Sequence, residues 1–291
     1  MSLELNETSI DIPLGRITGL RSAATEHAPR VLALHGWLDN AASFVPLAKH
    51  LSGIELVAVD LPGHGQSVHL PPGAIYTFEM SVHHVLDIAD ALGWERFTLL
   101  GHSMGAGIAS LVAAACPNRI ERLVCIEALG GLAEEAENTV ARMRESVTAI
   151  RAIDGKSLRV FAEPGVAIQA RMRANAMSEP VARLIVDRGM REVPGGWQWS
   201  SDPRLMVPTW LRPVDAQVVA VCAGIECPTR VVFADPAQPY LPADVRRRYV
   251  DALPRGELLT MPGTHHLHME TPQPVAEWIR PFLARAGLAE K

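Results

Sequence analysis

The segment Gly101-His102-Ser103-Met104-Gly105 places a serine between two glycines, each two residues away from it. The apolar run 97–100 precedes this segment, and the small, apolar stretch 106–116 follows it without a proline. This pattern predicts a buried strand, a tight turn that carries the serine, and a buried helix. Side chains at both glycine positions would collide in such a turn. We therefore predict that Ser103 is presented as a nucleophile.

A serine hydroxyl is a weak nucleophile until a base takes its proton and a carboxylate holds that base. Three histidines near the C-terminus compete for the role of the base: His265, His266 and His268. They lack the carboxylate–histidine spacing that is typical of zinc hydrolases, so we expect no metal site there.

Two carboxylates compete for the third position. Glu127 directly follows the apolar run 123–126, and Asp235 directly follows the predicted strand 229–234. Catalytic groups collect at the carboxyl ends of strands in open parallel sheets. A carboxylate at the end of a buried strand is costly without a partner, and an imidazole N–H would be one. We predict Glu127 as the acid and keep Asp235 as the alternative.

Apolar runs alternate with helical stretches through most of the chain, which predicts βαβ units and a mostly parallel, doubly wound sheet. The rhythm breaks after Glu127 and returns at about residue 226. We expect residues 1–129 and 226–291 to form the core and residues 130–225 to form a helical cap after the sixth strand. The expected strands are 31–34, 56–59, 97–100, 122–126, 229–234 and 257–261; the expected helices include 41–51, 78–92, 139–153, 166–177, 243–253 and 274–286.

The composition of the 291 residues excludes some classes of partner. The net charge is −5 and no run of lysine and arginine appears, so we expect no binding of nucleic acid. The N-terminus lacks the layout of a signal peptide and no apolar run is long enough to span a bilayer. The four cysteines lack C-x-x-C spacing. We expect a cytoplasmic protein without a membrane partner, and we leave a homodimer open.

Five stretches carry a family resemblance. Nearly the whole chain resembles the α/β-hydrolase superfamily, and within it is most similar to serine hydrolase-like proteins, including their bacterial relatives. The first three stretches below are typical of the superfamily, and the last two indicate the subgroup. They are LHGWLDNAASF (34–44), VDLPGHGQS (59–67), LLGHSMGAG (99–107), IEALG (126–130) and WSSDPRL (199–205).

The resemblance implies roles for particular residues. The chain order of serine, acid and histidine, with a glutamate five residues and a proline seven residues after the histidine, implies His265 as the base. An acid on Glu127 resembles haloalkane dehalogenases that carry a glutamate after the corresponding strand. The oxyanion hole would use the backbone N–H groups of Trp37 and Met104.

These residues and the resemblance together predict a serine hydrolase. It would cleave carboxylic esters or thioesters of small to medium acyl substrates through an acyl-enzyme, without a cofactor. Hydrolysis of carbon–carbon bonds and acyl transfer use the same triad and stay open as alternatives. A receptor that binds a small molecule on the same fold without turning it over is the alternative from another class.

Overall fold

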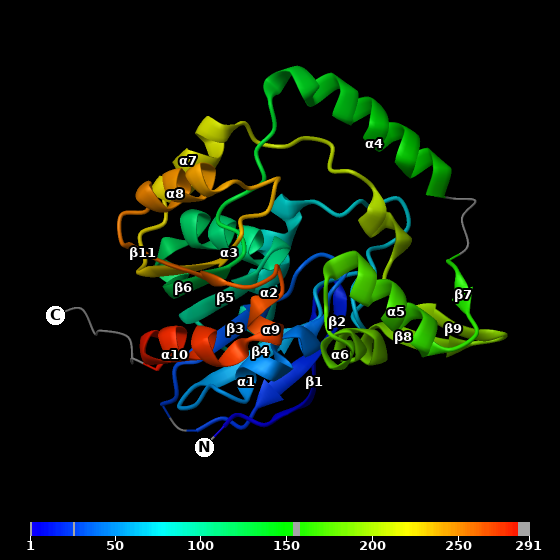
Figure 1. Ribbon diagram of the computed structural model, residues 1–291, viewed down its shortest axis with the longest axis horizontal. Coiled ribbons are helices and arrows are strands. Elements are labelled where there is room, and N and C mark those ends of the chain that lie inside the picture. The colour runs from blue at the N-terminus through cyan, green and yellow to red at the C-terminus, as the bar shows by residue number, and fades with distance from the viewer. Residues whose placement is uncertain (1, 26, 154–157, 285–291) are drawn as a thin grey trace.

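The computed structural model describes residues 2–25, 27–153 and 158–284. Its centre is an eight-stranded sheet with the order β1-β2-β4-β3-β5-β6-β10-β11 (Figure 1). Strand β2 is antiparallel to both of its neighbours, and every neighbouring pair from β4 to β11 is parallel. The predicted, mostly parallel sheet is confirmed. The strands are β1 (Leu5–Ile12), β2 (Gly15–Ser22), β3 (Arg30–Leu34), β4 (Glu55–Val59), β5 (Phe97–His102), β6 (Ile120–Ile126), β10 (Thr229–Asp235) and β11 (Gly256–Pro262).

Helices cover both faces of this sheet. In β3, Leu32 and Leu34 join the apolar cluster on one face, while Val31 and Ala33 join the cluster on the other. Because both faces are buried, the strand is continuously apolar rather than alternating. Helices α2 (Phe78–Ala91), α3 (Met104–Ala115), α7 (Asp215–Ala223) and α8 (Ala243–Asp251) pack on the first face; α1 (Val45–Ala48) and α10 (Pro272–Leu283) pack on the second, and the short α9 (Leu267–Glu270) contacts both of these helices.

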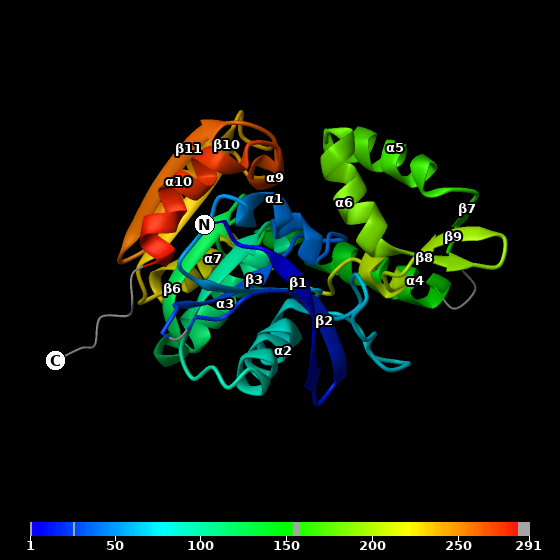
Figure 2. The ribbon, with the colours of Figure 1, turned by 90° about the horizontal axis from the view of Figure 1, so that it is seen from below.

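The chain between β6 and β10 is an insertion with a small apolar core of its own, which includes Phe161, Ile168 and Ile185. Figure 2 shows α5, α6 and the strands β8 and β9 as a lobe beside the main sheet. The predicted helical cap is therefore incomplete as a description, because three short strands pair in the order β7-β9-β8. The elements are α4 (Thr139–Ile153), β7 (Val160–Phe161), α5 (Pro164–Asn175), α6 (Glu179–Gly189), β8 (Met190–Val193) and β9 (Gly196–Trp199).

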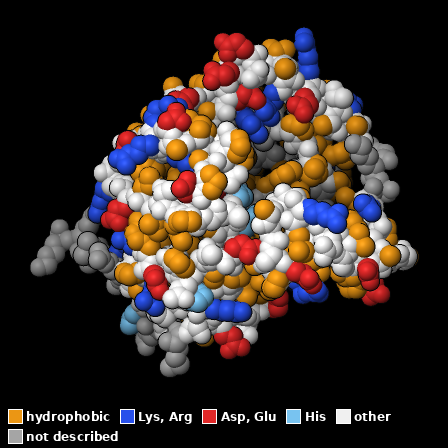
Figure 3. All heavy atoms as spheres, in the orientation of Figure 1, with side chains coloured by type: hydrophobic (Ala, Val, Ile, Leu, Met, Phe, Trp, Pro, Cys, Tyr) orange, Lys and Arg blue, Asp and Glu red, His pale blue; other side chains and the backbone are white. Residues whose placement is uncertain are grey.

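Helix α7 falls within the predicted cap segment, yet it packs against α3 and α8 on the main sheet. Below α4, the surface is hollowed and hydrophobic side chains lie on the walls of the hollow (Figure 3). Within the described parts of the chain, no helix is long and apolar enough to cross a membrane.

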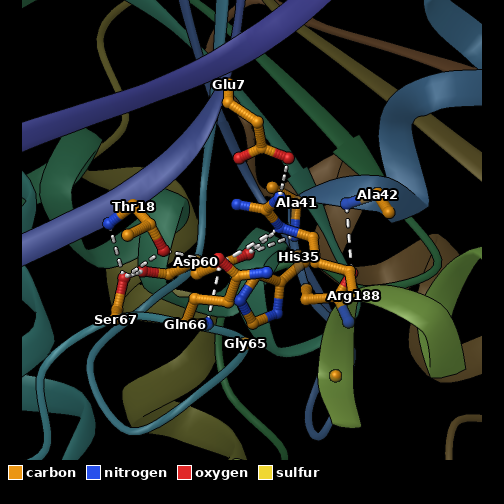
Figure 4. Close-up of polar contacts among 12 residues, drawn as sticks. Glu7, Thr18, His35, Ala41, Ala42, Asp60, Gly65, Gln66, Ser67 and Arg188 are labelled. Carbon is orange, nitrogen blue, oxygen red and sulfur yellow. Dashed lines mark hydrogen bonds and ion pairs between the residues drawn. The ribbon is translucent and has the colours of Figure 1, made fainter. Parts of the chain in front are cut away.

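A buried ion pair joins the insertion to the sheet. Asp60, directly after β4, accepts hydrogen bonds from Thr18 Oγ1 and from the backbone N–H groups of Ala41 and Gln66. Arg188 of α6 donates from Nε to both carboxylate oxygens of Asp60, at 3.0 and 3.1 Å, and from a second nitrogen to Glu7 (Figure 4). The side chain of Asp60 is fully buried, and the guanidinium is the cation that pairs with it out of water.

Replacing Arg188 with methionine should therefore destabilise the fold by about 3–5 kcal/mol, since it leaves a buried carboxylate without its cation. Urea unfolding followed by tryptophan fluorescence measures this loss. Arg183→Met on the same helix is the matched control, because Arg183 forms an exposed pair with Glu179 and should cost under about 0.5 kcal/mol. Equal losses in the two variants would show that the Arg188–Asp60 pair does not hold the insertion.

Candidate active site

The predicted turn around Ser103 is present between β5 and α3. Ser103 has φ = 50° and ψ = −117°, a backbone conformation that residues other than glycine rarely adopt. A Cβ on Gly101 would lie 2.4 Å from the Cα of Ala106, and a Cβ on Gly105 would lie 2.0 Å from the carbonyl oxygen of Leu34. Both glycines are therefore required by close approach of the backbone, as the sequence predicts.

Three predicted residues from distant parts of the chain meet at this turn. The Oγ of Ser103 lies 2.9 Å from Nε2 of His265. The other ring nitrogen of His265, Nδ1, lies 3.1 Å from Oε2 of Glu127. This is the geometry in which a carboxylate orients an imidazole and the imidazole accepts the proton of a serine hydroxyl.

Glu127 is held rigidly in this arrangement. It has φ = 61°, its side chain is fully buried, and its Oε1 accepts a hydrogen bond from the backbone N–H of Ala234 on β10. Arg246 of α8 brings a guanidinium nitrogen to 3.8 Å from Oε2. That arginine donates to the carbonyl groups of Leu241 and Ala234, so its position is fixed by the backbone. No motif in the sequence predicts a role for Arg246.

Asp235, the alternative acid, is not brought to the base. Asp235 is exposed at the end of β10, and within the described chain no hydrogen bond or ion pair links its side chain to His265. A phenol instead approaches the base, because the hydroxyl of Tyr240 lies 3.4 Å from Nδ1 of His265. Tyr240 stands in no motif of the sequence, and only the fold places it here.

The predicted oxyanion donors are Trp37 and Met104, and they lie just after the neighbouring strands β3 and β5. Leu34 of β3 pairs with Gly101 of β5, so the segment that carries Trp37 leaves the sheet beside the serine turn. Met104 is the first residue of α3, whose positive dipole end lies at the turn. The side chain of Trp37 is about half exposed, and its indole N–H donates to the carbonyl of Leu205 in the insertion, at 2.9 Å.

The two other competing histidines lie in a buried polar cluster. Nε2 of His266 is 3.2 Å from Oδ2 of Asp39, and Asp39 also pairs with Arg171 of α5. His268 is buried beside the ring of His102, with the two ring centroids 4.1 Å apart. Neither His266 nor His268 makes a hydrogen bond to Ser103, so His265 alone of the three occupies the position of a base in this part of the structure.

This cluster raises the question of a metal ion. In the described residues, ligand atoms of Asp39, His102 and His266 lie within 4.8 Å of one another. Arg171 already supplies a positive charge to the buried Asp39 carboxylate, and together with His266 it holds the pKa of that group well below its usual range, although burial alone would raise it. A dication would add charge next to this guanidinium in a desolvated site. We therefore assign the cluster no metal.

His102 links the cluster to the base. Its ring lies 2.9 Å, through Nε2, from the backbone oxygen of His265. Burial lowers the pKa of His102 to about 4, and burial also lowers the pKa of His268 well below its usual value. Near pH 7 the His102 ring is neutral, so the hydrogen that Nε2 donates to the His265 carbonyl leaves Nδ1 unprotonated.

Acid should therefore destabilise the folded protein between pH 6.5 and 4. Because the folded-state pKa of His102 is lowered to about 4, the stability linked to its neutral form is complete above pH 6.5 and is lost as the pH falls. At pH 5 this histidine alone should cost about 2 kcal/mol. Urea unfolding at pH 7.5 and pH 5 measures the total loss.

In His102→Gln, whose amide can still donate to the His265 carbonyl, the loss between the two pH values should shrink by about that amount. His83→Gln, at an exposed position of α2, is the matched control. If His102→Gln and the control lose as much stability as the unmodified protein, the His102 ring is charged in the folded state and our assignment of a neutral ring is wrong.

Comparisons with known proteins agree with this geometry. Residues 29–199 match the model of the alpha/beta hydrolase fold family, which is more than half of the chain. The chain belongs to this family. The resemblance inferred from the motifs, and the fold that it implies, are confirmed.

Individual proteins and structures are similar to nearly the whole chain. A serine hydrolase-like protein of Mus musculus is 30% identical over 300 residues, which cover 96% of this chain and 95% of the mouse protein. The crystal structure of a hypothetical protein from Pseudomonas aeruginosa PAO1 is 39% identical, covers 96% of this chain and 99% of that one, and superposes with a TM-score of 0.89. A thioesterase domain from the curacin biosynthetic pathway shares the fold, with 24% identity over 95% of this chain and 99% of that one and a TM-score of 0.82. The similarity to the mouse serine hydrolase-like protein supports a hydrolase activity, and the two structures share the fold of this chain.

Proposed function

We propose that the protein is a serine hydrolase that cleaves carboxylic esters or thioesters through an acyl-enzyme on Ser103. The observation that carries this proposal is the continuous contact of Ser103 Oγ, the His265 ring and the Glu127 carboxylate, at 2.9 and 3.1 Å. Membership of the α/β-hydrolase family supports the same reaction class.

In the first half of the reaction, Ser103 Oγ attacks the acyl carbon while Nε2 of His265 takes the hydroxyl proton. The carbonyl oxygen becomes an oxyanion, and the backbone N–H groups of Trp37 and Met104 are the donors that would stabilise it. The tetrahedral intermediate collapses when the bond to the alcohol or thiol breaks and His265 returns its proton to that leaving group. Glu127 stabilises the imidazolium that forms between these two steps.

In the second half, a water molecule replaces the leaving group. His265 removes a proton from this water, the oxygen attacks the acyl carbon, and the ester bond to Ser103 breaks as the serine recovers its proton. The products are a carboxylic acid and the free enzyme. Arg246 and the Ala234 N–H hold the Glu127 carboxylate in place during both halves.

The nucleophile is tested with a fluorophosphonate probe. The unmodified protein should be labelled and should hydrolyse p-nitrophenyl acetate, while Ser103→Ala should show neither reaction, because the hydroxyl that His265 activates is removed. Labelling is read by gel fluorescence and turnover by absorbance. Equal labelling of the two proteins would overturn the assignment. Tight binding of small apolar ligands without turnover of any ester would instead favour the receptor alternative.

The acid is tested with two substitutions. Glu127→Gln should lower kcat by a factor on the order of 10³–10⁴, since an amide can no longer stabilise the imidazolium or select the productive ring tautomer. Asp235→Asn is the matched control at the other candidate position and should change kcat less than about threefold. Thermal unfolding of both variants checks that each is folded. A large loss in Asp235→Asn with near-normal Glu127→Gln would move the acid to the β10 loop.

A further inference from the structure

Several large apolar side chains in the insertion are exposed to solvent. Val140 and Val147 on α4 are 54% and 42% exposed, and Met206 in the turn Pro203–Met206 is 58% exposed. Trp210 and Leu211 farther along the same connection are exposed as well. Single exposed apolar residues need no explanation, whereas a contiguous group of them indicates a binding surface.

Hydrogen bonds and packing place these segments side by side. Helix α4 packs against the turn Pro203–Met206. Near the start of α4, Arg142 forms an ion pair with Glu134, and the backbone N–H of Glu134 donates to the carbonyl of Pro213 at 3.0 Å. The connection that carries Met206, Trp210 and Leu211 therefore runs along α4, as Figure 1 also shows.

Helix α4 has an apolar stripe without a core to cover it. Val140, Met143, Val147 and Ile150 recur at intervals of three and four residues, which puts them on one side of the helix. Among the described residues of α4, only the polar Ser146 is buried. Val140 and Val147 of this stripe are exposed to solvent, and Met143 and Ile150 are half-buried, so an apolar ligand could cover the stripe.

The exposed group continues into the proposed active site through Trp37. The backbone N–H of Trp37 is a proposed oxyanion donor, and its indole N–H donates to Leu205, the residue before Met206. The large, half-exposed indole thus bridges from the reacting carbonyl to the apolar connection. A hydrocarbon chain attached to that carbonyl would reach Met206 and α4 by following this connection from Trp37.

We propose that this surface, made by Trp37, Met206 and the stripe of α4, binds the hydrocarbon chain of a medium- or long-chain ester or thioester. The proposal rests on the proposed function and names its substrate class. Each methylene that leaves water contributes up to about 0.8 kcal/mol, or about a fourfold gain in binding, so a chain of six further methylenes has a large effect even when partly exposed.

A series of esters tests the proposal. For p-nitrophenyl esters, kcat/KM should rise at least about 100-fold from acetate to octanoate. Comparing ethyl acetate with octyl acetate in a pH-stat shows whether the chain lies on the acyl or the alcohol side. A flat series in both arms would overturn the proposal while leaving the proposed function intact.

Two substitutions connect the effect to the surface. Met206→Glu and Val147→Glu should each lower the ratio of kcat/KM for octanoate to that for acetate by at least about tenfold, because a carboxylate must lose water beside the chain. Val160→Glu, at a similarly exposed valine on β7, is the matched control and should leave the ratio unchanged. If all three variants have the same ratio of kcat/KM for octanoate to that for acetate, the proposed surface does not bind the chain.

A binding measurement separates the two proposals. The fluorescence of cis-parinaric acid, titrated with folded Ser103→Ala, reports occupation of the surface without turnover. Adding Met206→Glu should weaken this binding at least about tenfold, and Val160→Glu should not. Met206-dependent binding in a protein that hydrolyses no ester would support the apolar surface and defeat the proposed function. Binding that is insensitive to Met206 would overturn the surface.

Discussion

The close approach of three backbone segments around Ser103 is the constraint on which the site depends. The backbone of β5 contacts the start of α3, and the start of α3 contacts the end of β3. Both contacts are possible only because Gly101 and Gly105 have no side chain. Ser103 is fixed in its uncommon backbone conformation by these contacts, and its N–H donates to Ile126 at the end of β6. The serine turn therefore fixes its position relative to both neighbouring strands, from which the predicted oxyanion donor Trp37 and the acid Glu127 emerge.

The adjacency of β6 and β10 explains how an acid can stand after β6. The N–H of Glu127 donates to Val232 of β10, and its carboxylate accepts from Ala234 two residues farther along that strand. The two strand ends lie side by side, so a carboxylate from either could face His265. The longer glutamate side chain, a left-handed backbone at Glu127 and the guanidinium of Arg246 bring the β6 carboxylate to the imidazole.

Polar contacts join the insertion to the sheet near the site, in addition to apolar packing. Arg171 pairs with Asp39, Arg188 pairs with Asp60, and Glu270 accepts the N–H of Ser178. The two aspartates follow β3 and β4, which are neighbours in the sheet, and β3 lies beside β5, the strand that precedes the serine turn. Because each carboxylate is buried, the pairs fix where the insertion sits and thereby which apolar residues face the site. Helix α4 buries little of its surface against the rest of the protein, so its apolar stripe is available to the ligand that we propose.

The sequence alone determined the parallel strands, the serine turn and the family, because short apolar runs, required glycines and motif spacing are local properties of the chain. It also predicted Glu127 and His265, whose meeting the structure shows. The hairpin of β1 and β2 was missed, since alternating residues at a sheet edge carry a weak signal, and the strands of the insertion were missed because they are only two to four residues long. Tertiary structure alone decided the contacts of Arg246 and Tyr240 with the site, and it also brought Asp39, His102 and His266 together. Their partners lie far away in the chain, and no local pattern encodes a contact between side chains that only the folded sheet brings together.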